Sequence, residues 1–151
     1  MKTVLSLAAA MSLMVGAAQA GEWRVVSTTD EFIKAVDYSS FRRNSPTSDV
    51  WRVWTAVIYR NSGSRNYDFF VSREEIDCRE DTVSYLTTSY YTVGGEVLSS
   101  DNRPTEAEYI IPDTISDYVF RAVCQGMVFR EGTWERVDSL VNDYRGATRG
   151  R

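Results

Sequence analysis

The two cysteines of the chain, Cys78 and Cys124, restrict its fold more than any other feature. Cys78 ends a segment whose side chains alternate as in a β-strand, and Cys124 falls in the last turn of a segment with helical periodicity. Phe70, Ile76 and Cys78 share one face of such a strand. A disulfide between the cysteines would therefore join the end of a helix to the core face of a strand, whereas two free thiols are the alternative.

The first 20 residues are typical of a secretory leader. A basic start at Lys2 precedes an apolar stretch at 4–18, which is shorter than the roughly 20 residues that cross a bilayer. An A-x-A site ends at Ala20, so we predict cleavage after it and export to the periplasm, the cell surface or the medium. These spaces are oxidising, which favours the disulfide. Gly21 rather than a cysteine follows the site, so we expect no lipid or membrane anchor.

Alternating apolar residues and the turn residues between them predict an α+β fold with an antiparallel β-sheet of about six strands. Residues 50–59 are apolar on both faces, which indicates a central strand. Strict alternation places Val83, Tyr85 and Tyr91 on one face, and Gly94-Gly95 predicts a tight hairpin. The expected strands are 23–27, 32–37, 50–59, 67–78, 82–93 and 96–99, with a short edge segment at 108–111.

Two helices are expected after the sheet. The first starts at Asp113 or Thr114 and ends near Gly126, and its last turn would carry the disulfide. The second is short, is capped by Thr133, has Trp134 in register and gives way to a frayed tail from Arg145. We therefore divide the chain into a leader at 1–20, a domain at 21–126 and a C-terminal helical extension with a tail at 127–151.

The composition argues against most enzyme classes. The chain has no histidine, the commonest general base and transition-metal ligand, and no phosphate-binding glycine motif. We expect no metal, no cofactor and no catalysis, and the net charge of −4 argues against nucleic acid as a partner. A carboxylate-based hydrolase that uses Glu75, Asp77 and Glu80 is the remaining catalytic alternative.

Aromatic residues of the predicted strands are the candidate binding surface: Trp51, Tyr85, Tyr90 and Tyr91. Tyrosine and tryptophan dominate binding hot spots, which favours a protein partner. The alternative is that these rings form the core of the sheet beneath the helices.

Several positions together resemble the surface-adhesin E family of exported bacterial proteins. They are Trp23, Asp37 with Ser40, the segment 50–54, the segment 75–78, Tyr91 with Gly95 and Val97, the segment 112–114, and Val123 with Cys124. The resemblance implies an antiparallel sheet with a disulfide-tethered C-terminal helix.

The resemblance also implies a non-enzymatic function, adhesion to a protein partner. We expect this function, with self-association into a homodimer as a further contact through a sheet edge. The absence of a lipid-anchor cysteine keeps open the alternative of a periplasmic structural or envelope-maintenance protein without a host ligand.

Overall fold

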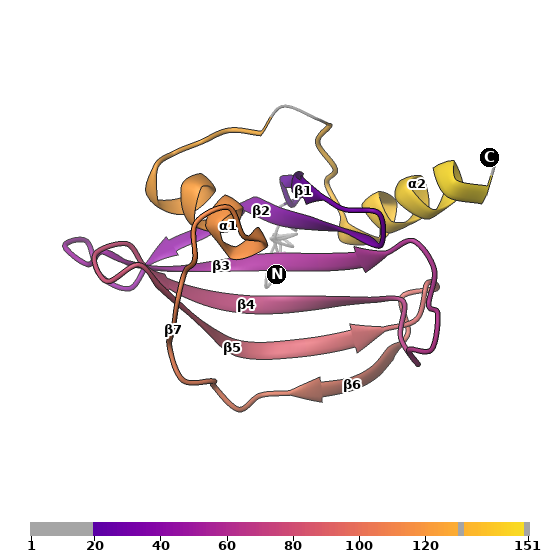
Figure 1. Ribbon diagram of the computed structural model, residues 1–151, viewed down its shortest axis with the longest axis horizontal. Helices are drawn as coiled ribbons and strands as arrows, with labels where there is room; N and C mark the ends of the chain where they lie inside the picture. The colour runs from indigo at the N-terminus through magenta and orange to yellow at the C-terminus, as the bar shows by residue number, and fades with distance from the viewer. Residues whose placement is uncertain (1–19, 130–131, 150–151) are drawn as a thin grey trace, which may run out of the picture.

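The computed structural model describes residues 20–129 and 132–149. The predicted leader, apart from Ala20, lies outside the described residues. The described residues form one antiparallel sheet and two helices, α1 (Ile115–Cys124) and α2 (Val137–Arg149), which lie towards opposite ends of the strands (Figure 1). The strands are β1 (Trp23–Thr28), β2 (Phe32–Arg43), β3 (Val50–Tyr59), β4 (Phe69–Asp77), β5 (Thr82–Tyr91), β6 (Val97–Asp101) and β7 (Glu108–Tyr109).

The sheet is a meander in which each strand pairs with the next in the order β1-β2-β3-β4-β5-β6, and β7 pairs with β5. The antiparallel α+β fold predicted from alternation is therefore confirmed. β3 lies in the middle, and Val53 on one face and Ala56 and Ile58 on the other are buried, as expected of a central strand. Gly95, with φ of +84°, closes the predicted hairpin between β5 and β6.

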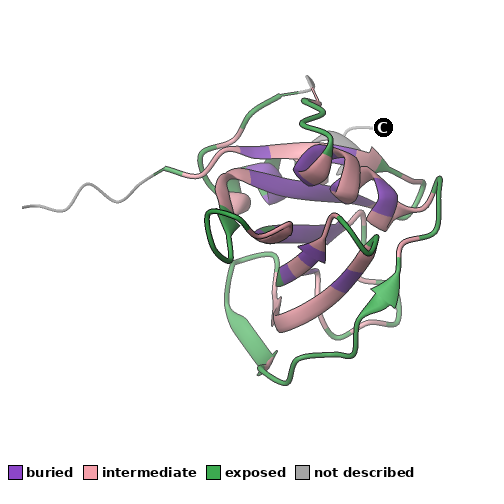
Figure 2. Cartoon of the chain, turned by 90° about the vertical axis from the view of Figure 1, so that its left-hand side faces the viewer, coloured by how far each residue is buried: buried purple, intermediate pink, exposed green. Residues whose placement is uncertain are grey.

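Each face of the sheet carries its own hydrophobic cluster under one helix. On the α2 face, Leu140 and Val141 pack on side chains of the first four strands, among them Ile33, Ile58 and Phe69. On the opposite face, the α1 face, the buried residues are Val26, Val36, Val53, Ile76, Val83, Val119, Ala122 and Val123. Buried residues concentrate in the central strands and α1, while β6 and β7 are mostly exposed (Figure 2).

The predicted disulfide joins Cys78, directly after β4, to Cys124, the last residue of α1. The two Cα atoms are 5.6 Å apart, within the usual range for a disulfide. Both cysteines pack against the α1-face cluster, so the covalent bond and the buried side chains hold α1 in the same place.

β2 is longer than predicted, because it resumes after an irregularity instead of ending at Asp37. The Ser40 hydroxyl donates to the carbonyl oxygen of Asp37 at 2.6 Å and accepts from the backbone N–H of Trp54 at 2.9 Å. A side chain thus satisfies backbone groups where regular pairing is lost. This contact also gives Asp37 and Ser40, two positions of the family resemblance, a structural role.

β5 contains a bulge that the predicted alternation did not include. Arg73 is opposite Thr87 and Glu74 is opposite Tyr85, so Leu86 is an extra residue in β5. Tyr85 consequently lies on the α1 face with Glu74, whereas Tyr91 pairs with Phe69, which belongs to the α2-face cluster. The expectation that Tyr85 and Tyr91 share a face was therefore wrong.

The second helix differs from its prediction at both ends. Trp134 forms a β-bridge with Trp23, and its backbone N–H donates to the Trp23 carbonyl oxygen at 3.0 Å, so the helix begins only at Val137. The expected tail from Arg145 is helical as far as Arg149. Arg145 forms an ion pair with Asp68 before β4, a tertiary contact that helical periodicity alone does not reveal.

Candidate functional site

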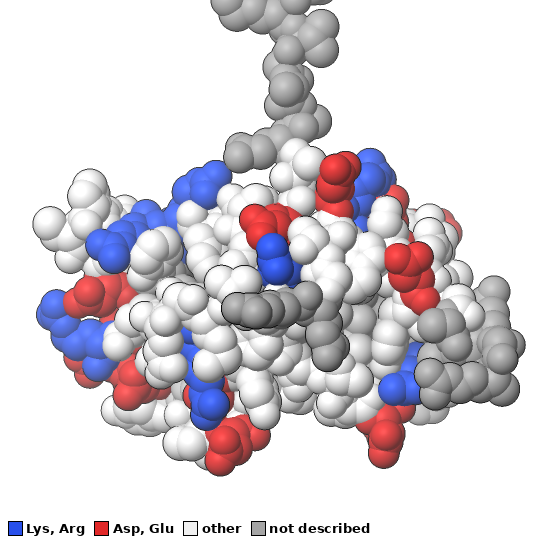
Figure 3. Space-filling view, turned by 90° about the horizontal axis from the view of Figure 1, so that it is seen from above, with Lys and Arg blue, Asp and Glu red and all other residues white. Residues whose placement is uncertain are grey.

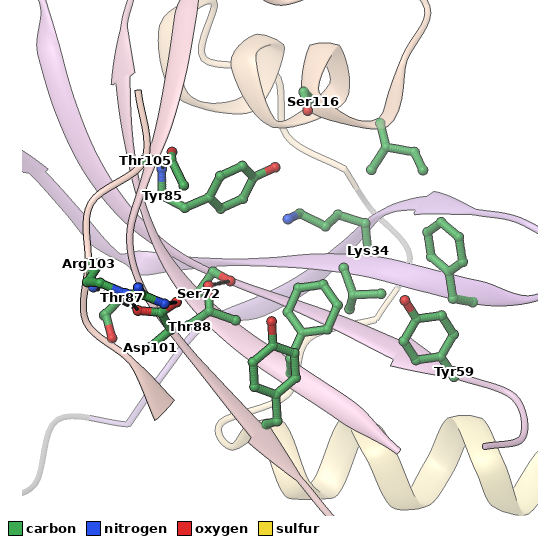
Figure 4. A pocket seen from close by; sticks show the side chains of 15 residues that line it. Lys34, Tyr59, Ser72, Tyr85, Thr87, Thr88, Asp101, Arg103, Thr105 and Ser116 are labelled. Carbon is green, nitrogen blue, oxygen red and sulfur yellow. Dashed lines mark hydrogen bonds and ion pairs between the residues drawn. The ribbon is translucent and has the colours of Figure 1, made fainter. Parts of the chain in front are cut away.

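A hollow with a volume of about 480 Å³ lies on the α1 face, beside the N-terminal end of α1. We call it the aromatic cleft (Figure 4). Strands β2 to β5 form its floor, and the segment after β6 forms part of its rim. Its lining residues are Phe32, Lys34, Val57, Tyr59, Phe70, Ser72, Tyr85, Thr87, Thr88, Tyr90, Asp101, Arg103, Thr105, Ile115 and Ser116.

One wall of the aromatic cleft is a group of packed rings. The ring centroids of Phe70 and Tyr90 are 5.8 Å apart, and those of Tyr59 and Phe70 are 6.4 Å apart. Tyr67 extends the group, with its centroid 4.8 Å from that of Tyr90. The Arg65 guanidinium lies 3.8 Å from the centroid of Tyr59. Each ring is partly exposed, so the group presents a preorganised surface with apolar faces and phenolic hydroxyls.

A buried ion pair lies beneath the cleft. The Lys34 ammonium is 2.6 Å from Oε1 of Glu74, and the two residues are only 4% and 1% exposed. Lys34 also donates to the Thr55 hydroxyl at 3.0 Å, and that hydroxyl donates to the same Glu74 oxygen at 2.5 Å. Two opposite charges in this closed arrangement offset each other, so the floor of the cleft is polar but locally neutral.

Tyr85 projects from β5 across the cleft, towards Lys34 on β2 and Ser116 on α1 (Figure 4). Burial raises the pKa of Tyr85 to about 12, the negative charge of Glu74 acts in the same direction, and a hydrogen bond with Ser116 opposes them. The phenol therefore stays protonated at neutral pH and can donate a hydrogen bond. The backbone N–H of Tyr85 donates a hydrogen bond to the Thr105 hydroxyl at 2.9 Å.

The structure separates the four predicted surface residues. Tyr85 and Tyr90 line the aromatic cleft. Trp51 packs against the α1-face cluster with Arg43 4.7 Å from its ring centroid, and Tyr91 stacks on Phe69 at 4.8 Å on the other face. The cleft thus contains two of the four predicted residues. The other two, Trp51 and Tyr91, pack against the hydrophobic clusters, as in the alternative in which these rings form the core.

Sequence reasoning missed three other residues of the site: Lys34, Tyr59 and Phe70. The register of the β3–β4 hairpin places Val57 opposite Phe70, and the register of the β4–β5 hairpin places Phe70 opposite Tyr90. Pairing the predicted strands across both hairpins would have brought Phe70 and Tyr90 together. For Lys34, the signal is a lysine between apolar residues of a predicted strand, two strands away from the one that carries Glu74.

Two of the three carboxylates of the hydrolase alternative have structural partners. Glu75 pairs with Arg52 at 2.9 Å, and Asp77 accepts backbone hydrogen bonds from Arg79 and Glu80 in the turn after β4. The lining of the aromatic cleft contains none of the three candidate carboxylates. Among residues 20–129 and 132–149, no group of three or more His, Cys, Asp or Glu side chains is placed to hold a metal ion.

Charges of both signs are interspersed on the face seen from above (Figure 3). Many charged side chains of the described residues pair locally, as Arg121 does with Asp117 and Arg136 with Asp138. In the part of the chain that the structure describes, we find no helix long and apolar enough to span a membrane.

The fold, the disulfide and the cleft define a small disulfide-linked α+β protein with one sheet face left partly open. The chain belongs to the surface-adhesin protein E family, whose model matches residues 23–125. This membership indicates a surface adhesin and an exported location. Comparison with curated proteins and with solved structures gave no match. The matched region ends just after the disulfide, and α2 lies beyond it.

Proposed function

We propose that this chain is an exported, non-enzymatic adhesin domain that binds a protein partner through the aromatic cleft. The observation that carries the proposal is the ring group of Tyr59, Tyr67, Phe70 and Tyr90, packed together yet open on the part of the α1 face that α1 leaves uncovered. Family membership supports the same function.

The chemistry of the cleft suits protein recognition. Tyrosine side chains offer large contact areas at a low cost in conformational entropy, and they are enriched among residues that dominate binding energy. Mutual packing holds the rings before a partner arrives, which reduces the cost of association. Threonine and serine hydroxyls and the Tyr85 phenol supply hydrogen bonds around this apolar centre.

The polar groups of the cleft are arranged for structure rather than for turnover. Lys34 is tied to both Glu74 and Thr55, and Arg103 is tied to Asp101 at 3.0 Å. A side chain that acts as a nucleophile or general base must be free to react with a substrate atom. This arrangement therefore supports binding without catalysis.

The proposal is tested by comparing capture of extracellular host proteins by the mature wild-type chain and by two variants. Tyr59→Ala/Tyr90→Ala removes two rings of the cleft, and Tyr109→Ala removes a ring that is 80% exposed on β7. A partner retained by the wild type and by Tyr109→Ala, but lost with the double variant, supports the proposal. Equal retention by all three folded proteins contradicts it. Near-ultraviolet circular dichroism checks the fold of each variant.

The alternative, a periplasmic structural or envelope-maintenance protein, predicts a different location. Fractionation of the producing cells, with protease applied to intact cells, separates the two functions. Surface exposure supports adhesion, whereas a strictly periplasmic pool supports the alternative.

Self-association is a separate proposal that concerns the sheet edge. β6 is an edge strand, and its apolar residues Val97 and Leu98 are exposed. Exposed edges pair readily with strands of another copy. Light scattering after size exclusion, on the wild type and on Leu98→Lys, measures this: a dimer that the substitution dissociates supports pairing through β6, and a wild-type monomer contradicts it.

A further inference from the structure

A second hollow lies on the α2 face of the sheet and has a volume of about 200 Å³. We call it the arginine hollow. Its lining residues are Ser40, Arg42, Arg52, Val53, Trp54 and Arg73. Trp54, one of these residues, is 37% exposed, although it belongs to the central strand β3. An indole left open on a central strand calls for an explanation, because tryptophan is usually well buried.

Strand register brings these residues together. Trp54 is opposite Arg73 on β4, and Arg42 is opposite Arg52 across the β2–β3 pair. The irregularity of β2 after Asp37 turns the Ser40 hydroxyl to the Trp54 backbone at 2.9 Å. A bulge of this kind re-aims side chains, and here it sets Arg42 and Ser40 beside the exposed indole.

The guanidinium groups of the three arginines in the hollow have different partners. Arg52 forms an ion pair with Glu75 at 2.9 Å. Arg42 donates to the carbonyl oxygens of Ser39 and Phe41, and the guanidinium of Arg73 lies 6.0 Å from the centroid of Trp54. Within residues 20–129 and 132–149, neither Arg42 nor Arg73 has a carboxylate partner in the structure.

The other acidic group at this site is already occupied. Asp37, which is opposite Trp54, is buried, and its Oδ1 accepts from the backbone N–H groups of Glu22 and Ser39 and from the Ser39 hydroxyl. Three guanidinium groups therefore face two carboxylates that have their own donors. The result is a local positive excess on a chain whose net charge is −4.

We propose that the arginine hollow binds an anionic sugar chain through its sulfate or carboxylate groups. Guanidinium groups form paired hydrogen bonds with such oxyanions. The exposed indole offers a flat apolar surface for the C–H face of a sugar ring, which an acidic peptide side chain does not need. The site lies on the opposite face of the sheet from the aromatic cleft, so it is independent of the proposed protein-binding function.

The test uses a heparin hexasaccharide, titrated into the mature disulfide-bonded chain and followed by calorimetry and tryptophan fluorescence. Arg73→Gln should weaken binding about tenfold, the loss expected for one charge-assisted hydrogen-bonded contact. Arg103→Gln, which removes the same charge from the rim of the aromatic cleft, should leave the affinity within about twofold, because an exposed charge that distant is screened. Trp54→Phe should abolish the fluorescence change.

Three results would overturn the proposal. Equal weakening by Arg73→Gln and Arg103→Gln would show attraction to overall charge rather than to this site. Binding of polyglutamate as tight as that of the hexasaccharide would show that the hollow accepts any polyanion and does not recognise sugar. Absence of hexasaccharide binding to the wild type at low salt also contradicts the proposal, whereas a fully desulfated hexasaccharide that binds as tightly would support recognition through the carboxylates.

Discussion

The ammonium group of Lys34 lies 2.6 Å from a carboxylate oxygen of Glu74, and these two buried residues come from strands separated by β3. Removing one partner leaves an uncompensated charge in the protein interior. We therefore expect Glu74→Gln to lower the free energy of unfolding by about 3 to 5 kcal/mol, measured by urea denaturation at neutral pH.

Two comparisons test this interpretation of the ion pair. Glu75→Gln removes the partner of Arg52 from a more exposed pair and should cost less than about 1 kcal/mol. The triple variant Lys34→Met/Thr55→Val/Glu74→Leu removes all three polar groups and should recover most of the lost stability. A Glu74→Gln variant as stable as Glu75→Gln would contradict the prediction.

The disulfide should supply a large share of the stability. Cys78 and Cys124 are 46 residues apart in sequence, and the loop-entropy relation gives about 4 kcal/mol for a loop of this length. Cys78→Ala/Cys124→Ala should therefore lower the free energy of unfolding by about that amount. Adding a reductant should have a similar effect on the wild type and none on the variant, and an unchanged unfolding midpoint in the variant would refute the prediction.

Helix α2 should contribute to the stability of the sheet although it lies outside the matched family region. Leu140 is fully buried against the α2-face cluster, so Leu140→Ala should cost about 2 to 5 kcal/mol. Asn142 is exposed on the same helix, and Asn142→Ala should change stability by less than about 0.5 kcal/mol. Equal, small effects of the two substitutions in chemical unfolding would show that α2 does not pack on the sheet in solution.

Acid should weaken the connection between α2 and the loop before β4. Burial raises the pKa of Asp68, but hydrogen bonds from Ser62, Arg145 and the backbone N–H of Val93 outweigh it and lower the pKa below its ordinary value of 3.8. A lowered pKa in the folded state stabilises the protein at pH values above 3.8, and this contribution disappears as the pH falls through the folded-state pKa.

Urea denaturation at pH 7 and at pH 3 measures this effect. The wild type should lose more stability between the two conditions than Asp68→Asn, because the other carboxylates titrate in both proteins. The amide variant should already be less stable at pH 7. Identical losses in both proteins would rule out the assigned role of Asp68.

Local sequence patterns predicted the main elements well, because the periodicity of a helix or strand can be recognised from residues that are close together in the chain. The apolar residues at 50–59 indicated the central strand β3, and the two-residue period of a strand placed Cys78 on the face that α1 covers. The same period failed for Tyr91, because the bulge at Leu86 in β5 reverses the faces beyond it. Bulges depend on the partner strand, which a pattern within one segment does not contain.

The candidate sites were harder to predict for the same reason. Lys34 and Glu74 are 40 residues apart, and their contact follows only from the register of β2, β3 and β4. Trp134 has helical spacing from Val137 and Val141, yet its backbone pairs with Trp23 instead.

The amino-acid order therefore indicates the main strands and the start of α1, since short-range periodicity is a property of residues close together in the chain. It also indicates the cysteine pairing, since the sequence contains two cysteines and an export leader that leads to an oxidising space. Three properties were decided only in the assembled sheet: which tyrosines line the aromatic cleft, the exposure of Trp54 to solvent, and the packing of α2 on the sheet. Those properties arise from hydrogen bonds and packing between residues far apart in the chain, and their free energy exists only once the strands are in register.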